Sequence, residues 1–127
     1  MLVIDGSKIE GTLIPEPFKR VVKVFMAPDT QDHCKDISVT QGIFYPHSMN
    51  DLHTHEGFEI IYIISGYGKC VIGDETYDIK PDTLVICPPG VPHRQINESD
   101  ETLKQLAIWT PALKGSEVVT RAVETAK

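Results

Sequence analysis

The sequence contains no apolar stretch long enough to cross a membrane. A spanning helix needs about 20 consecutive apolar residues, whereas the apolar runs of this 127-residue chain are short and are broken by glycine, proline and polar residues. The opening segment, MLVIDGSKIEG, also lacks the basic-then-apolar order of a secretory signal. We therefore expect a cytoplasmic protein that has no membrane partner.

Positive charge is scarce and scattered. The chain has 12 Lys and Arg residues against 18 Asp and Glu residues, so its net charge is −6. A nucleic-acid-binding protein usually gathers Lys and Arg on one face or along one stripe. The sequence therefore argues against DNA or RNA as a partner, and its acidity favours solubility.

Cysteine is rare, and its spacing argues against two kinds of site. Cys34, Cys70 and Cys87 form no CxxC pair, and their odd number does not suit a disulfide framework. Cys70 and Cys87 lie in apolar runs, which predicts buried, reduced thiols. Cys34 follows His33 in the polar segment DTQDHCKD, which we interpret as a solvated loop because adjacent residues rarely face each other.

The chain does contain a series of short β-branched runs separated by turn residues. This pattern is typical of an all-β sandwich or barrel. Residues 71–79, VIGDETYDI, predict a hairpin whose turn is made by Gly73 and Asp74. Residues 59–64, EIIYII, are apolar at both parities, which predicts a central strand that is covered on both faces.

The length predicts a single domain over residues 1–127, with a barrel core at about 18–110. The first sixteen residues are expected to contribute an edge strand. The end of the chain predicts a short helix at about 116–126, docked on the barrel or on a partner subunit, with Ser116 as its N-cap. Its apolar stripe comprises Val119, Ala122, Val123 and Ala126.

The segment HTHEGFE, residues 53–59, concentrates groups that bind metal ions. His53 and His55 share a face if this segment is extended, because side chains two apart in a strand point the same way. Four strand residues span about 13 Å, so Glu59 can join them only if the chain bends, which Gly57 permits. Glu59 would then point inward at the start of a strand.

A fourth ligand candidate follows in CPPGVPHRQIN. His93 stands behind three prolines, each of which fixes its backbone φ, so the segment is stiff. The set His53, His55, Glu59 and His93 suits Fe(II), Mn(II), Ni(II), Co(II) or Zn(II). An octahedral ion held by four protein ligands keeps two positions for water, substrate or oxygen.

Simpler interpretations of these residues remain open. A His-x-His pair is commonly a surface pair. Glu56 and Glu59 are also explained as exposed carboxylates, and His93 as a loop histidine.

Two motifs resemble those of the cupin superfamily. HTHEGFEIIYIISG is similar to the first motif, His-x-His, three or four residues, Glu, six residues, Gly, which places His53, His55, Glu59 and Gly66. PPGVPHRQIN is similar to the second, Pro-x-Gly, two residues, His, three residues, Asn, which places Pro88, Gly90, His93 and Asn97. With the β-rich pattern, the resemblance extends from about Val21 to Trp109.

The resemblance implies a double-stranded β-helix, or jelly-roll barrel, that holds a metal ion through His53, His55, Glu59 and His93. It also implies a homodimer, which is a common assembly in the family. Two positions depart from the family pattern, because His47 and Asp82 stand where glycine is frequent. Both positions concern turns rather than ligands.

Strand parity places Gln95 and Asn97 on the same face as His93. We name Tyr45 and Gln95 as pocket candidates and expect Asn97 to tie down a turn. Trp109 is a further aromatic that either lines the mouth of the barrel or packs in its core. No side chain beyond the ligands stands out as a catalytic acid or base, so the catalytic residues stay unassigned.

Our leading hypothesis is a metal-dependent enzyme acting on a small polar molecule that coordinates through oxygen. With iron the reaction would be a dioxygenation; without redox chemistry it would be an isomerisation, decarboxylation or elimination. The alternative is a non-catalytic module that binds a metal, sugar or carboxylate. A third option is an interaction protein whose barrel supports a dimer. Fold alone does not separate these functions.

Overall fold

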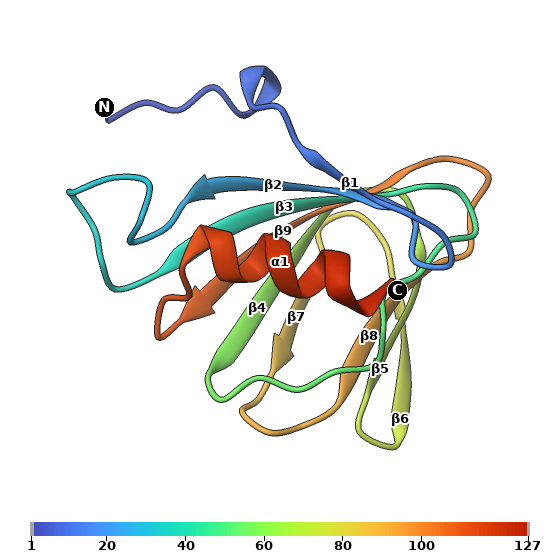
Figure 1. Ribbon diagram of the computed structural model, residues 1–127. Coiled ribbons are helices and arrows are strands. Elements are labelled where there is room, and N and C mark those ends of the chain that lie inside the picture. The colour runs from blue at the N-terminus through green and yellow to red at the C-terminus, as the bar shows by residue number, and fades with distance from the viewer. Residues whose placement is uncertain (1, 127) are drawn as a thin grey trace.

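The computed structural model describes residues 2–126, and Figure 1 shows two antiparallel sheets and a C-terminal helix. Within these residues a short 3₁₀ helix, η1 (Gly6–Lys8), precedes the strands. The strands are β1 (Thr12–Ile14), β2 (Arg20–Met26), β3 (Ser38–Phe44), β4 (Phe58–Ser65), β5 (Gly68–Ile72), β6 (Glu75–Ile79), β7 (Leu84–Cys87), β8 (His93–Asn97) and β9 (Leu103–Thr110). The helix is α1 (Gly115–Thr125).

The strands form the predicted jelly-roll barrel. The larger sheet has the order β1-β2-β3-β9-β4-β7, and the smaller sheet has the order β6-β5-β8. The expected hairpin is present, since β5 and β6 pair directly across a turn at Gly73, which has a φ of 59°. The edge strand expected near the N-terminus is β1. Among residues 2–126, no helix has the length and apolar character needed to cross a bilayer.

Strand β4 shows how the core is built. Glu59, Ile61 and Ile63 point into the barrel and are buried, as their shared parity predicts. The strand lies between β9 and β7, so its central position is confirmed. The expectation that both of its faces are covered is wrong for this chain, because Tyr62 and Ile64 on the outer face are exposed.

The neighbours Ile63 and Ile64 provide a matched test of this geometry. We expect Ile63→Ala to lower the free energy of unfolding by about 2–5 kcal/mol, because it leaves a cavity in a closed core. Ile64→Ala should change it by about 0.5 kcal/mol or less, since Ile64 is 41% exposed and Ile63 is 0% exposed. Urea unfolding at low protein concentration measures both values. Equal losses would contradict the assigned strand parity.

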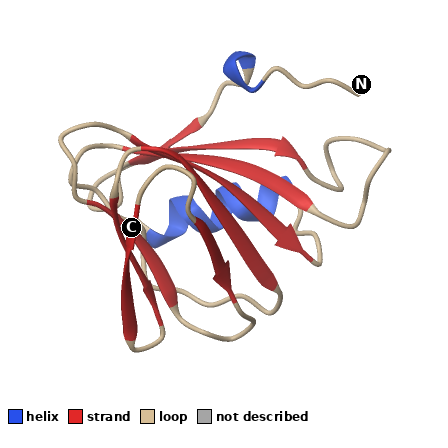
Figure 2. Cartoon of the chain, turned by 180° about the vertical axis from the view of Figure 1, so that it is seen from behind, coloured by secondary structure: helices blue, strands red, loops and turns tan. Residues whose placement is uncertain are grey.

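Helix α1 begins one residue earlier than predicted, and its cap differs. Ser116 does not cap it; the carboxylate of Asp29, in the loop after β2, accepts hydrogen bonds from the backbone N–H groups of Gly115 (2.7 Å) and Ser116 (3.2 Å). These bonds lower the pKa of Asp29. The buried helix residues are Gly115, Val118 and Ala122. Ala122 belongs to the predicted stripe, whose members Val123 and Ala126 also pack against the core, whereas Val118 was not predicted. Val118 is inside because the helix packs against β1 and β2, seen from behind in Figure 2.

The cysteines behave as the sequence predicts. Cys70 and Cys87 are buried free thiols, and Cys34 is partly exposed in the loop between β2 and β3. Burial raises the pKa of Cys70 to about 12, so this thiol stays protonated at neutral pH. Burial also raises the pKa of Cys87, so neither buried thiol is a candidate nucleophile.

Candidate metal centre

The structure brings His53, His55, Glu59 and His93 together. One potential ligand atom from each residue lies within 4.8 Å of all the others. Glu59 comes from β4 in the larger sheet and His93 from β8 in the smaller sheet, so the site bridges the two sheets. His53 and His93 are also joined through their backbones, by N–H···O bonds of 3.1 and 2.9 Å.

The chain reaches Glu59 by the predicted bend at Gly57, although the reason for the glycine differs from the expected one. The backbone φ of Gly57 is not in the left-handed region. Instead, a Cβ atom at this position would lie 2.5 Å from the carbonyl oxygen of Thr110. Glycine is needed here because β9 passes too close for any side chain.

Glu59 is the electrostatic centre of the cluster. Its Oε1 atom lies 3.1 Å from Nε2 of His55 and 3.0 Å from Nε2 of His93. Burial alone would raise the pKa of Glu59, but the bonds from the two imidazoles outweigh it and lower the pKa to about 2. Glu59 is therefore a carboxylate at any pH at which the protein would function.

The other ring nitrogens determine which imidazole atoms are free for a metal. Nδ1 of His53 donates to the carbonyl oxygen of Asp51 (2.8 Å), and Nδ1 of His93 donates to that of Val91 (3.1 Å). Backbone acceptors of this kind orient a metal-binding imidazole and leave Nε2 available. These residues fit a divalent ion: three imidazoles and one ionised carboxylate, buried or nearly so, with Nδ1 of two rings already bonded to backbone oxygens. Nε2 of His93 donates to Glu59 only while that ring is protonated, so this proton leaves when a metal ion binds.

His55 is held differently, by a residue that sequence reasoning missed. Arg121 on α1 donates to Nδ1 of His55 (2.7 Å) and to the carbonyl oxygen of Thr54 (2.8 Å). Because Nδ1 of His55 accepts, the ring proton is at Nε2 and is donated to Glu59. Binding of a metal ion at Nε2 would require the other tautomer, with the proton on Nδ1, so the bond from Arg121 to Nδ1 would have to be exchanged for another partner.

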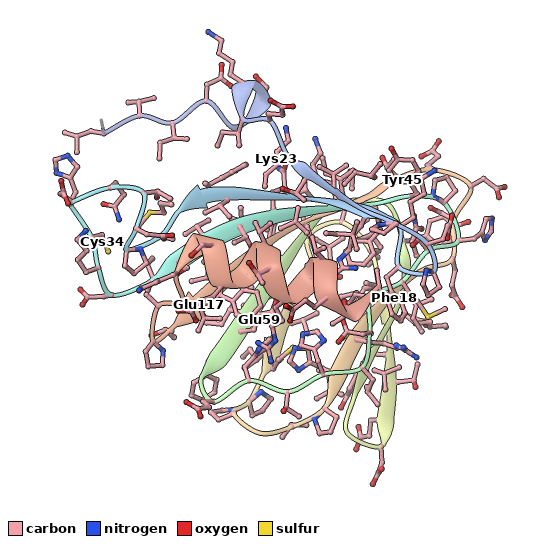
Figure 3. The ribbon with its side chains drawn as sticks, viewed as in Figure 1. Phe18, Lys23, Cys34, Tyr45, Glu59 and Glu117 are labelled. Atoms are coloured by element: carbon pink, nitrogen blue, oxygen red, sulfur yellow. The ribbon has the colours of Figure 1, made fainter. Side chains whose placement is uncertain are left out.

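The cluster opens onto a cavity between the larger sheet and α1. The cavity has an empty volume of about 650 Å³, which includes space open to solvent. In Figure 3 the labelled Glu59 lies below α1 among several nitrogen-bearing rings. Trp109 lines the cavity, with its ring centroid 4.5 Å from that of His55. Polar residues of the wall are Arg20, Thr40, Gln41, Asn50, Asp51, Gln105, Arg121 and Thr125.

Neither pocket candidate named from the sequence belongs to this wall. Tyr45 lies just beyond the end of β3, where Lys19 stacks on its ring at 4.5 Å, and Figure 3 shows it well away from Glu59. Gln95 does point into the barrel, but it is covered: its Nε2 donates to Oε1 of Gln105 (3.0 Å), and Gln105 is the residue that reaches the cavity. Strand parity predicted that the Gln95 side chain points into the barrel, but it did not predict that Gln105 lies between Gln95 and the cavity.

The turn residues of the two motifs have a physical explanation. Gly66 and Gly90 both have positive φ, of 86° and 74°. His47 and Asp82 stand where glycine is frequent in the resembling family, and they also have positive φ, of 59° and 69°. The turns therefore keep a left-handed geometry even without glycine, at a modest conformational cost.

Arg20, Asp51 and Arg121 line the cavity and were not identified from the sequence. Asp51 lies only two residues before His53, and this short spacing could have identified it as a residue of the site. Arg20 begins a strand and Arg121 lies on the exposed side of a helix pattern, so no local feature distinguished either of them.

Residues 42–109 match the family model described as a cupin domain, which is more than half of the chain. This chain belongs to the cupin family. Among curated relatives, L-ectoine synthase of Aliivibrio fischeri (strain MJ11) is 33% identical over 75 residues, covering 58% of this chain and 59% of the relative. The H2HPP isomerase of Bacillus subtilis is 31% identical over 86 residues, covering 67% of this chain and 36% of the relative.

Solved cupin-like structures share the fold at lower identity. A predicted oxalate decarboxylase from Thermotoga maritima has a TM-score of 0.78 and 24% identity, covering 87% of this chain and 99% of that one. The polyketide cyclase RemF from Streptomyces resistomycificus has a TM-score of 0.74 and 18% identity, covering 99% and 98%. These likenesses establish the barrel. The two curated relatives named above match this chain over less than two thirds of their length, so they do not establish an activity.

Metal binding to this cupin should weaken in mild acid. Burial lowers the pKa of His53, which keeps it neutral. Burial also acts to lower the pKa of His93, but the hydrogen bond and charge of Glu59 outweigh it and raise that pKa above its ordinary value. A metal must displace the proton that His93 gains as the pH falls through this raised pKa.

We therefore expect affinity for Zn²⁺ to fall between about pH 8 and pH 6, by up to tenfold per pH unit for each displaced proton. Competition with a chromophoric chelator measures the affinity. Constant affinity across this range would contradict ligation through His93.

Proposed function

We propose that this cupin is an enzyme that holds a divalent metal ion through His53, His55, Glu59 and His93 and acts on a small molecule with oxygen donors. The observation that carries the proposal is that three of the four candidate ligands, His53, His55 and Glu59, lie in the wall of a cavity that is partly open to solvent. A structural metal site would be closed on all sides.

When bound, the ion would act as a Lewis acid toward a carbonyl, carboxylate or hydroxyl oxygen. Residues of the chain would transfer the substrate proton and limit access of water. Asp51 is the one carboxylate of the wall other than Glu59 among the described residues, so we assign to it the acceptance and return of a substrate proton. Trp109 and Phe44 supply apolar wall that limits access of water.

Two kinds of chemistry are open to such a site, and we favour the one without redox. The relatives reported above carry the names synthase, isomerase, decarboxylase and cyclase. Such reactions move protons and carbon–carbon or carbon–oxygen bonds, which a Lewis acid and a carboxylate base serve together. Dioxygenation is the less favoured option.

Three cysteines without a disulfide support a reducing, cytoplasmic location.

The test begins with the metal content of protein purified without added metal. Reloaded protein is then assayed on 2-oxo acids and oxalate for CO₂ release or tautomerisation, and on catechols, 1,3-diketones and thiols for oxygen uptake. We expect turnover in the first group that requires metal and falls at least 100-fold in Asp51→Asn, which keeps its metal. Oxygen uptake would overturn the non-redox assignment, and wild-type protein unable to bind a divalent metal would overturn the proposal.

A non-catalytic binding module is the second candidate. The observation that favours it is the small number of proton-transfer groups, since Asp51 is the only one in the described wall that is not a proposed ligand. A binding module would show saturable affinity for a small molecule and no turnover in either group of assays.

We also propose that the exposed outer face of β4 and β7 joins two copies of the chain. Five large apolar side chains lie exposed on these neighbouring strands: Phe58, Tyr62, Ile64, Leu84 and Ile86. An uncharged apolar patch can pair with its own copy without like-charge repulsion, although each chain has a net charge of −6. Sedimentation should give a dimer for the wild type and a monomer for Ile86→Lys. A monomeric wild type would contradict the proposal.

A further inference from the structure

We infer that the substrate carries a carboxylate, and that Arg20 on β2 binds it. This inference rests on the proposed function for the role of the site, but Arg20 itself belongs to neither the ligand set nor the proton-transfer residues. It narrows the substrate class from any small molecule with oxygen donors to a small organic acid.

Arg20 is a buried cation with no ion pair among residues 2–126, and the carboxylates of Asp51 and Glu59 act on its charge only from beyond ion-pair distance. Its side chain lines the cavity, and the residue is 7% exposed. Its Nη1 donates to the carbonyl oxygen of Phe18 (3.0 Å), and the guanidinium carbon lies 5.9 Å from the centre of the Phe44 ring.

An arginine in this position is costly unless something compensates its charge. A guanidinium has five N–H donors in a planar fork, and one bond to a backbone oxygen leaves most of them free. Burying an unpaired charge carries a large desolvation penalty. A carboxylate ligand would remove it, because the fork matches the two oxygens of a carboxylate.

The summed charge of the cavity wall also favours a negatively charged ligand. Its wall holds two cations, Arg20 and Arg121, and two anions, Asp51 and Glu59, which balance to zero. A divalent ion at the candidate centre would leave the cavity with a charge of about +2, inside a protein of net charge −6. Such a site favours an anion over a neutral sugar.

The wall near Phe44 has little space for a side chain at position 42. Gly42 lines the cavity from β3, and a Cβ atom there would lie 3.3 Å from the Phe44 ring and 3.5 Å from the Gln105 side chain. The first distance is tighter than an ordinary contact, so a larger residue would displace the Phe44 ring, whose centre lies 5.9 Å from the guanidinium carbon of Arg20. Gln105 also lines the cavity and offers a further polar contact.

Binding is measured through Trp109, which is the only tryptophan of the chain and lines the cavity. The probes are malonate and its neutral analogue malonamide, titrated at constant ionic strength into protein loaded with Zn²⁺, which does not quench fluorescence. We expect a saturable response to malonate and at least tenfold weaker binding of malonamide. Bonds to a charged group contribute about 1.5–3 kcal/mol, so Arg20→Met should weaken malonate binding at least tenfold.

The matched control is Lys69→Gln, which removes one positive charge outside the cavity and should bind malonate as the wild type does. Gly42→Val is the second variant, because its side chain would crowd the Phe44 ring beside the Arg20 guanidinium and leaves the four ligands unchanged. It should also weaken malonate binding while zinc content stays unchanged.

Wild-type affinity for malonate in Arg20→Met, or in Gly42→Val should the first variant fail to fold, would overturn the inference. So would a wild type that does not respond to malonate, or that binds malonamide equally well. Failure of the proposed function gives a different result. The wild type would then bind no zinc, but malonate binding that depends on Arg20 would still be measured in the metal-free protein.

Discussion

Replacing His93 with alanine should lower the affinity for a divalent metal by more than about 100-fold. Loss of a residue that only orients a ligand typically costs 10- to 100-fold, and His93 is proposed as a ligand itself. It is also the only member of the set that comes from the smaller sheet, so nothing in HTHEGFE can take its place. Chelator competition measures the loss, and elemental analysis of the purified protein confirms it.

The matched control is His33→Ala. His33 is an exposed histidine in the loop between β2 and β3, remote in sequence from the cluster, and its loss should leave metal content unchanged. His55→Ala should behave like His93→Ala, because both imidazoles contact Glu59. If either ligand variant kept wild-type metal content, the assigned centre would be wrong.

Asn97→Ala should lower the free energy of unfolding by roughly 3–5 kcal/mol, at the high end for a single substitution. Asn97 is 1% exposed and joins three parts of the chain. Its Nδ2 donates to the carbonyl oxygens of Phe44 (3.3 Å), Tyr45 (3.0 Å) and Glu101 (2.8 Å). Its Oδ1 accepts from the backbone N–H (2.9 Å) and hydroxyl (2.7 Å) of Ser99. Alanine leaves these buried groups unpaired.

Asn97→Asp separates the two halves of this network. It keeps the acceptor for Ser99 but replaces the donor with a carboxylate oxygen facing three carbonyl oxygens, so it should destabilise at least as much as alanine. Glu98→Ala, at an exposed neighbour, should change stability by about 0.5 kcal/mol or less. Urea unfolding measures all three. A loss below about 1 kcal/mol in both Asn97 variants would show that the turn does not depend on this side chain.

The strand pattern was predictable because it follows from local geometry. Alternation in 59–64 correctly placed Glu59, Ile61 and Ile63 inside the barrel. The same alternation could not show that the other face lacks a covering layer, because an apolar outer face has the same sequence pattern whether it is buried or exposed. Parity likewise directed Gln95 inward but did not show that Gln105 stands between it and the cavity.

The convergence of the two histidine motifs was predicted by their resemblance to the cupin motifs, and local features were consistent with it. His53, His55 and Glu59 lie within seven residues, and the stiff segment before His93 restricts where that side chain can go. Residues whose roles depend on long-range docking had no such signal. Asp29 caps a helix that begins 86 residues later, and Arg121 reaches His55 across 66 residues.

The amino-acid sequence by itself indicated an all-β protein with four candidate metal ligands, because strand parity, turn residues and short-range spacing are local properties of the chain, and the resemblance of its motifs to those of cupins implied the barrel. Only the tertiary structure decided what surrounds those ligands: the cavity, the unpaired Arg20, the carboxylate of Asp51 and the helix that covers them. These features arise where β2, the segment before β4 and α1 meet, and their contacts depend on packing between segments that are far apart in the chain.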